Sequence, residues 1–133
     1  MKLQTASKLA IYAVLELAQE PERQISAAEI ADKYKVSIHH LAKVLHTLGR
    51  AGHVRAVRGA SGGYVFSGNA KRTTLSDIIS LFETLGNSAD ETDNGAESTP
   101  IEKGLAKVMG EIDDITAATL SSITLSTMLK HTA

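Results

Sequence analysis

Apolar residues recur at helical spacing along most of this chain. Leucine, alanine and valine repeat in this way from residue 5 to residue 19, and Pro21 ends the pattern. A second, short helix is predicted to begin after Ser26 and to end near residues 33–35. Ser26 and Glu29 have the Ser-x-x-Glu spacing of a capping box, in which each residue satisfies a backbone N–H of the other.

A third helix is predicted to begin after Ser37, which caps it, and to end at Gly52, which accepts left-handed backbone geometry. Its buried stripe consists of Leu41, Val44, Leu45 and Leu48. Its outward face consists of His39, His40, Lys43 and Thr47. Two helices joined by a turn at residues 34–36, the second with a small polar outer face, are typical of a helix-turn-helix.

The pattern then changes to two short β-rich runs, Val54–Val57 and Tyr64–Ser67. They flank the loop 58–63, which contains three glycines, so a hairpin is expected. A helix followed by a hairpin with a basic tip is the element order of a winged helix. A fourth helix is predicted to begin at Thr74 or Ser76 and to run through Leu85.

Periodicity disappears between residues 86 and 100, where acidic and small polar residues predict an acidic, flexible loop. After Pro100 a long helix is predicted with a heptad seam, which a second copy of the chain would cover. The predicted dimer interface is Ile101, Leu105, Val108, Ile112 and Ile115. Thr124 is expected to cap a last short helix over residues 125–130.

The predicted fold is therefore mainly α with a small β-hairpin: a winged helix-turn-helix with a long C-terminal dimerisation helix. Residues 1–85 would form the DNA-binding part, residues 86–100 the loop, and residues 101–133 the dimerisation helix and the short terminal helix. A length of 133 residues fits one such domain.

Composition excludes several classes of protein. The chain has no cysteine, which removes disulfides, thiolate nucleophiles and cysteine-ligated metal clusters. No apolar run approaches the roughly 20 residues of a membrane span, and the first residues lack the apolar core of a signal peptide, so a cytoplasmic protein is expected. No nucleophile, base and orienting group can be assembled, so an enzyme is not expected.

Charge is distributed unevenly along the chain. Residues 33–76 contain eight Lys or Arg, four His and no Asp or Glu, although the formal net charge of the whole chain is −1. Residues 1–85 carry eleven basic and seven acidic residues, and residues 86–133 carry three and eight. A basic surface without acids, in a winged-helix pattern, indicates double-stranded DNA as the partner.

Arg58 is the strongest candidate for DNA contact, because an arginine beside glycines at a hairpin tip can enter a narrow minor groove. His39, His40 and Lys43 are expected to face base edges near the start of the third helix. Phosphate contacts are expected from Lys8, Ser37, Lys43, Ser61, Gly62 and Gly63, although the glycine run could instead be only a tight turn.

Other ligands fit these patterns less well. The histidines lack the converging carboxylate partners that a metal or haem site needs. The acidic loop lacks the register of a calcium loop, and the glycine run lacks the Lys-Ser/Thr pair of a P-loop. No metal and no cofactor are expected.

Several segments resemble the Rrf family of bacterial winged-helix transcriptional regulators, the IscR, NsrR and CymR group. The resemblance spans almost the whole chain and rests on residues 1–3, 15–18, 36–38 with Leu41, 48–54, 57–64 and 123–125. The Val-Arg-Gly-x-x-Gly-Gly run directly after a helix is its most specific part.

The resemblance implies a homodimeric regulator that reads an imperfect palindrome, with the third helix in the major groove and the wing against the minor groove. Many members hold an iron-sulfur cluster through three cysteines in the loop before the long helix, where residues 87–99 of this chain have none. A repressor or dual regulator without that cluster is therefore expected. An unknown small-molecule effector, a protein co-regulator and no effector at all are each compatible with the sequence. The alternative is a winged-helix protein-interaction module with weak DNA binding, which a shallow salt dependence of DNA affinity would reveal.

Overall fold

The computed structural model describes residues 2–59, 62–85 and 98–132. Its elements are α1 (Thr5–Gln19), α2 (Ala27–Tyr34), α3 (Ile38–Arg50), β1 (Val54–Val57), β2 (Gly63–Phe66), α4 (Leu75–Ile79), α5 (Pro100–Ser121) and α6 (Leu125–Lys130). The strands form an antiparallel hairpin in which Val54 pairs with Phe66 and Val57 with Gly63. These elements confirm the mainly α fold with a small β-hairpin.

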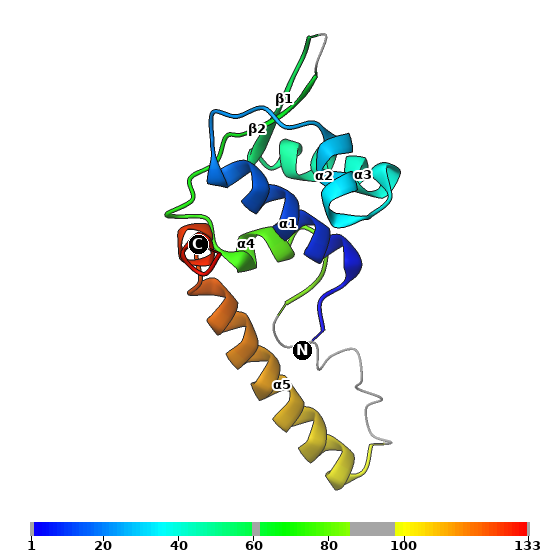
Figure 1. Cartoon of the computed structure of the whole chain (residues 1–133). Coiled ribbons are helices and arrows are strands. Elements are labelled where there is room, and N and C mark those ends of the chain that lie inside the picture. Colours follow the sequence, from blue (N-terminus) through cyan, green and yellow to red (C-terminus); the bar gives the residue numbers. More distant parts are fainter. Residues whose placement is uncertain (1, 60–61, 86–97, 133) are drawn as a thin grey trace.

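Helix α1 is the centre of the core (Figure 1) and contacts α3, α4, α6 and β2. Because neighbours pack on several of its sides, its apolar residues are buried around most of its circumference rather than on one stripe. Tyr12 is exposed, and its ring stacks on that of Tyr34 with centroids 4.9 Å apart. The start of α1 is held from outside the helix, because the Glu83 carboxylate accepts hydrogen bonds from the Gln4 N–H and the Ser7 hydroxyl.

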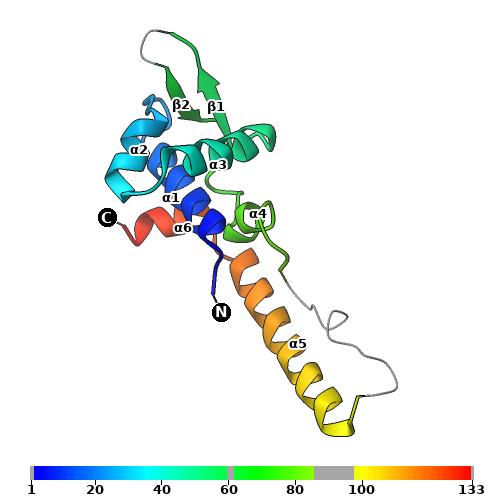
Figure 2. The ribbon, with the colours of Figure 1, turned by 90° about the vertical axis from the view of Figure 1, so that its right-hand side faces the viewer.

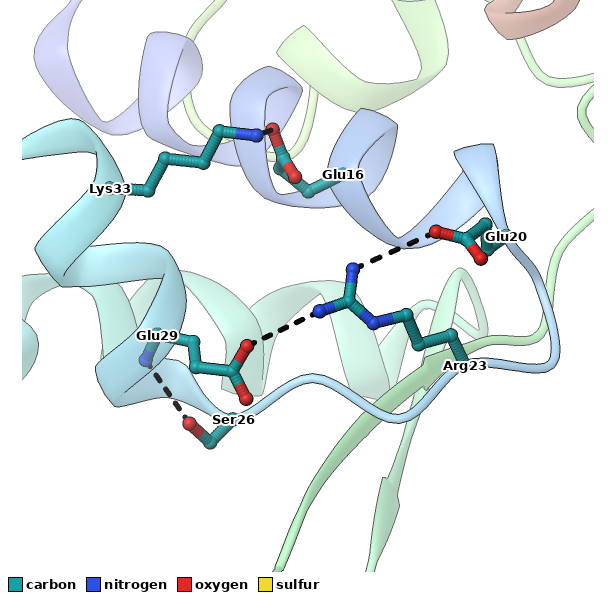
Figure 3. Close-up of polar contacts among 6 residues, drawn as sticks. All are labelled: Glu16, Glu20, Arg23, Ser26, Glu29 and Lys33. Atoms are coloured by element: carbon teal, nitrogen blue, oxygen red, sulfur yellow. Dashed lines mark hydrogen bonds and ion pairs between the residues drawn. The ribbon is translucent and has the colours of Figure 1, made fainter.

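Helices α2 and α3 form the predicted helix-turn-helix. Lys35 adopts left-handed geometry with φ 55°, and the Lys35 and Val36 N–H groups close the end of α2 on the carbonyls of Asp32 and Ala31. Only one of the two hydrogen bonds of the predicted capping box at the start of α2 is present. The Ser26 hydroxyl accepts the Glu29 N–H at 3.1 Å, but the Glu29 carboxylate turns to Arg23 at 3.6 Å (Figure 3), because the charged guanidinium is the stronger partner.

The end of α3 and the base of the hairpin are joined as the sequence predicts. Gly52 has φ 87°, and the N–H groups of Gly52 and His53 donate to the carbonyls of Gly49 and Leu48. This pair of hydrogen bonds is a Schellman motif. The Ser67 N–H and hydroxyl then donate to the carbonyls of His53 and Gly52, so both strands of the hairpin leave the end of α3 together.

The fourth helix is shorter than the predicted run to Leu85. It begins after Thr74, whose capping box with Asp77 is complete, but α4 ends at Ile79 and residues 80–83 continue as turns. The bond from Glu83 to the start of α1 fixes this segment, so a tertiary contact replaces the last helical turns that the apolar pattern predicts. Phe82 and Leu85 still pack against the core.

Helix α5 and the hairpin project from opposite ends of the molecule, as two perpendicular views show (Figures 1 and 2). Thr99 and Glu102 form a complete capping box at the start of α5. The chain then returns to the body, where Leu125 is fully buried and its N–H donates to the Thr73 carbonyl at 2.9 Å. Helix α6 therefore anchors the projecting helix to the core.

No helix in the described ranges is long and apolar enough to span a lipid bilayer.

Candidate DNA interface

The outer face of α3 carries the residues predicted to meet bases. His39 and Lys43 are exposed and His40 is partly exposed, while the opposite stripe of Leu41, Val44, Leu45 and Leu48 is almost fully buried. The buried stripe fixes the rotation of the helix, so the polar face is presented to solvent without competing contacts to the core. This arrangement agrees with the prediction that His39, His40 and Lys43 point outward.

Ser37 is confirmed as the N-cap of α3. Its hydroxyl accepts the His40 N–H at 3.2 Å, which leaves the remaining N–H groups of the first turn directed outward. Such a helix start attracts phosphate oxygens, because the unpaired N–H groups and the helix dipole both favour negative charge. The predicted phosphate contact of Ser37 would use its backbone N–H rather than its capping hydroxyl.

The wing presents Arg58 at its tip. Arg58 is exposed directly after β1, and Gly59 has φ 139°, where a residue with a side chain would be strained. The Gly62 N–H donates to the Gly59 carbonyl at 3.1 Å, so it closes the loop and is not directed at solvent. Ser61 lies outside the described residues.

Gly63 lies where the wing meets the segment before α2. Its neighbour Tyr64 exchanges two backbone hydrogen bonds with Ile25, of 2.8 and 3.0 Å. Gly63 is partly buried beside this bridge, so its predicted phosphate contact competes with a packing role.

Cationic groups around the interface differ in their availability. Lys33, within the acid-free stretch, lies 2.8 Å from the Glu16 carboxylate (Figure 3). Within residues 2–59, 62–85 and 98–132, the ion pairs do not include Lys43, Arg55 or Arg58. These side chains are therefore free to neutralise phosphates.

The Glu16 carboxylate is almost buried, and its surroundings control its charge. Burial acts to raise its pKa, but hydrogen bonds from Lys33 and Tyr34, together with the nearby positive charge, outweigh burial and lower the pKa. The same contact and burial raise the pKa of the Tyr34 phenol. Glu16 is thus a structural anion that joins α1 to α2 and pairs with the Lys33 ammonium.

The remaining predicted cation, Lys8, is exposed in the first turns of α1, and Lys71 and Arg72 are exposed after the wing. Sequence reasoning missed two exposed residues beside the predicted ones. Arg55 lies on β1, and Ile38 is 45% exposed in the first turn of α3. The signal for Ile38 was available in the sequence, because an isoleucine directly after the cap lies off the buried stripe.

The predicted dimer seam on α5 is exposed in the single chain. Ile101, Leu105, Val108, Ile112 and Ile115 are between 48% and 84% exposed. Met109, which the heptad pattern did not single out, is 49% exposed beside them and widens the apolar face. The largest contact that α5 makes in the described part of the chain is with α4.

The histidines do not converge. Among the described residues, no group of three or more His, Asp or Glu could hold a metal ion. His53 is partly buried at the base of the wing, where burial lowers its pKa and the charge of Asp77 partly opposes that effect.

A helix-turn-helix with a free cationic face, followed by a wing with an arginine tip, defines a winged-helix transcriptional regulator that binds DNA. Residues 3–131 match the Rrf2 family, described as an iron-dependent transcriptional regulator. The chain belongs to this family.

The relatives agree with this assignment. The chain is 49% identical over 132 residues to BadM of Rhodopseudomonas palustris, described as an HTH-type transcriptional regulator, and the match covers 98% of this chain and 82% of BadM. Its structure is similar to CymR (YrzC), the global cysteine regulator of B. subtilis, with a TM-score of 0.81 and 27% identity over 100% of this chain and 99% of CymR. It is also similar to IscR of T. potens, with a TM-score of 0.78 and 28% identity over 100% of this chain and 89% of IscR.

The family description names iron, but the donor set of this chain does not fit an iron centre held by cysteines. The sequence contains no cysteine, and the described histidines and carboxylates form no cluster that would replace it. The acidic residues 90–97, weighed above as a calcium loop, lie outside the described residues.

Proposed function

We propose that this protein binds a pseudo-palindromic DNA operator as a homodimer and represses transcription in the cytoplasm, without a cysteine-ligated iron-sulfur cluster. The observation that carries the proposal is the outer face of α3, where exposed His39 and Lys43 lie beside a capped helix start and no described ion pair occupies Lys43. In the major groove, His39, His40 and Lys43 would meet base edges.

The wing would complete the contact. Arg58, free of ion pairs within the described residues, would enter the minor groove beside the α3 site, where negative potential is concentrated. Lys8, Ser37 and Ser61 would bind phosphates and set the register, and exposed Arg55 extends this set along β1. Ile38 would add an apolar contact to a thymine methyl group, which is a feature of the major groove alone.

Dimerisation through α5 would place two such units on one operator. A second copy of the chain would cover the exposed apolar seam from Ile101 to Ile115, since contiguous exposed apolar surface marks interaction sites. A twofold arrangement would present two α3 helices to half-sites about one helical turn, or ~34 Å, apart. In this proposal residues 1–85 read DNA, residues 86–100 connect, and residues 101–133 join the subunits while α6 packs back on the body.

The test is selection of binding fragments from the organism's own genome with purified protein, followed by footprinting. The proposal predicts a protected inverted repeat, and loss of that protection for the double variant Lys43→Ala/Arg58→Ala. Lys107→Ala, an exposed change on α5, is the control and should bind as the wild type does. Selection of no common sequence would favour the protein-interaction alternative, and reporter expression with and without the protein tests repression.

A further inference from the structure

A two-stranded hairpin is only marginally stable by itself, so the direction of the wing must be fixed by contacts outside β1 and β2. One contact is at the base of the hairpin, where Ser67 bonds to Gly52 and His53. The other is on the free edge of β2, where Ile25 acts as a one-residue third strand beside Tyr64. This second contact lies closer to the tip, so it has more control over where Arg58 points.

The Ile25 anchor is firmly placed. Ile25 is 4% exposed, its N–H donates to the Tyr64 carbonyl at 3.0 Å, and its carbonyl accepts the Tyr64 N–H at 2.8 Å. The segment before it is linked to α2 and to the residue that follows α1, because Arg23 lies 3.6 Å from Glu29 and 3.7 Å from Glu20 (Figure 3). Ile25 thus connects the wing to the body that carries α3.

Gly63 leaves no room for a side chain at this bridge. A Cβ atom at Gly63 would lie 2.9 Å from the Ile25 carbonyl oxygen and 3.0 Å from both the Ile25 carbonyl carbon and Gln24 Cγ. Two of these atoms are backbone, so they cannot rotate away as a flexible side chain would. Gly63 is not among the described glycines with positive φ, so its requirement is for space and not for unusual backbone angles.

Gly62 provides a natural comparison. A Cβ at Gly62 would approach only the Gly59 carbonyl oxygen, at 3.8 Å, and the Val57 carbonyl oxygen, at 3.9 Å, which are ordinary contacts. Gly62 likewise does not have positive φ. Alanine should therefore be accepted at Gly62 and should force β2 away from Ile25 at Gly63.

We infer that Gly63 is a positioning residue for DNA binding: the absence of its side chain lets β2 bond to Ile25, and this contact aims the Arg58 tip. This inference rests on the proposed role of the wing in contacting DNA. Its structural part, the direction of the wing, is independent of any DNA.

The direction of the wing can be measured without DNA. The chain has no cysteine, so spin labels can be attached at Ala56→Cys on β1 and Ala42→Cys on α3, two exposed positions. Labelled chains diluted with unlabelled chains would report the distance within one subunit. Gly63→Ala should shift or broaden the distance distribution, and Gly62→Ala should leave it unchanged.

DNA binding gives the second readout. Gly63→Ala and Arg58→Ala should each weaken operator binding by about tenfold, and each should remove the minor-groove footprint while the α3 footprint remains. In an Arg58→Ala background Gly63→Ala should have little further effect, because both changes remove the same contact. If Gly63→Ala instead acts by a general loss of stability, it should weaken both footprints, and its effect on affinity should add to that of Arg58→Ala.

Unchanged distance and unchanged affinity in Gly63→Ala would overturn the inference. If Gly63→Ala does not fold, it is repeated in a Lys35→Gly background, which relieves the left-handed residue before α3. Failure to fold there as well would show that Gly63 serves folding and not wing direction, and would also overturn it. If Gly63→Ala shifts the distance but the wild-type protein binds no operator, the result contradicts the proposed function and not the role of Gly63 in wing direction.

Discussion

The Tyr34 hydroxyl donates a hydrogen bond to the Glu16 carboxylate at 2.5 Å, and the Lys33 ammonium lies 2.8 Å from the same oxygen. This contact joins α2 to α1 directly before the turn that leads into α3. Since Lys33 is largely exposed, its ion pair adds little, and the hydrogen bond to the nearly buried carboxylate is the larger contribution.

Removal of this carboxylate should therefore destabilise the fold. Glu16→Ala is expected to lower the free energy of unfolding by about 1 to 3 kcal/mol, because the Tyr34 hydroxyl loses its partner and the helices lose a link. Urea denaturation followed by circular dichroism measures this change. Glu20→Ala, at an exposed position on the same chain segment, is the control and should stay within about 0.5 kcal/mol of the wild type. Equal effects of the two variants would contradict the assignment.

The lowered pKa of Glu16 also predicts a pH dependence. The folded state holds the carboxylate ionised to a lower pH than the unfolded chain, whose ordinary value is 4.5. The resulting stabilisation is present above that value and is lost as the pH falls through the lower folded pKa. As the pH falls from about 5 to about 3, the free energy of unfolding of the wild type should fall more steeply than that of Glu16→Gln. Parallel curves for the two proteins would show that another group controls acid unfolding.

Lys35 is the described non-glycine residue with positive φ, at the turn of the helix-turn-helix. A left-handed residue with a side chain costs about 1 kcal/mol, so Lys35→Gly should raise the free energy of unfolding by up to about 1 kcal/mol. Lys33→Gly, within α2, should instead lower it by about 1 kcal/mol. If Lys35→Gly instead lowers the free energy of unfolding, the lysine side chain stabilises the fold by more than its left-handed backbone destabilises it.

Local signals in the sequence predicted most of the fold. Ser37, Thr124 and Pro100 mark helix starts because their chemistry acts on neighbouring backbone groups, and Gly52 marks an end for the same reason. The errors came from side-chain partners that lie outside the helix whose pattern was read. Glu29 forms an ion pair with Arg23 instead of completing its capping box, and Glu83 accepts hydrogen bonds from the start of α1, which accompanies the shorter fourth helix.

The sequence predicts which residues form the candidate DNA-binding surface, but it does not predict the packing that holds the wing in position. The outer face of α3 and the wing tip follow from periodicity and charge. The bridge between Ile25 and Tyr64 joins residues 39 positions apart and leaves no sequence pattern, so the packing reason for Gly63 required the structure. The exposure of Ile38, in contrast, could have been predicted, because the residue directly after the cap lies off the buried stripe of α3.

Ile38 offers a chemical test of base reading. Ile38→Ala should weaken binding by about 0.8 kcal/mol for each methyl or methylene group that packs on a thymine methyl. Replacement of thymines in the operator by uracil removes those methyl groups, and it should weaken the wild type but not Ile38→Ala. Ala42→Ser, on the same helix, is the control. Equal sensitivity of wild type and Ile38→Ala to uracil would exclude this contact.

The exposed seam of α5 predicts the oligomeric state. Burying one leucine side chain contributes about 1.5 to 3 kcal/mol, so Leu105→Lys should weaken self-association by at least tenfold. Sedimentation equilibrium of wild type and variant measures this difference. Lys103→Ala, an exposed change outside the seam, should remain dimeric. A wild-type protein that stays monomeric at all concentrations would contradict the proposed interface.

The most direct test of DNA recognition by α3 and the wing is the salt dependence of operator affinity. Each neutralised phosphate contributes about 0.9 to the slope of log affinity against log salt concentration. The wild type should show a steep negative slope. Lys8→Ala and Arg55→Ala, which remove proposed phosphate contacts, should each reduce its magnitude by about 1. Lys43→Ala and Arg58→Ala should lower the affinity at fixed salt, while Lys107→Ala leaves slope and affinity unchanged. A shallow slope, or one that the double variant Lys43→Ala/Arg58→Ala does not alter in either magnitude or affinity, would contradict the account.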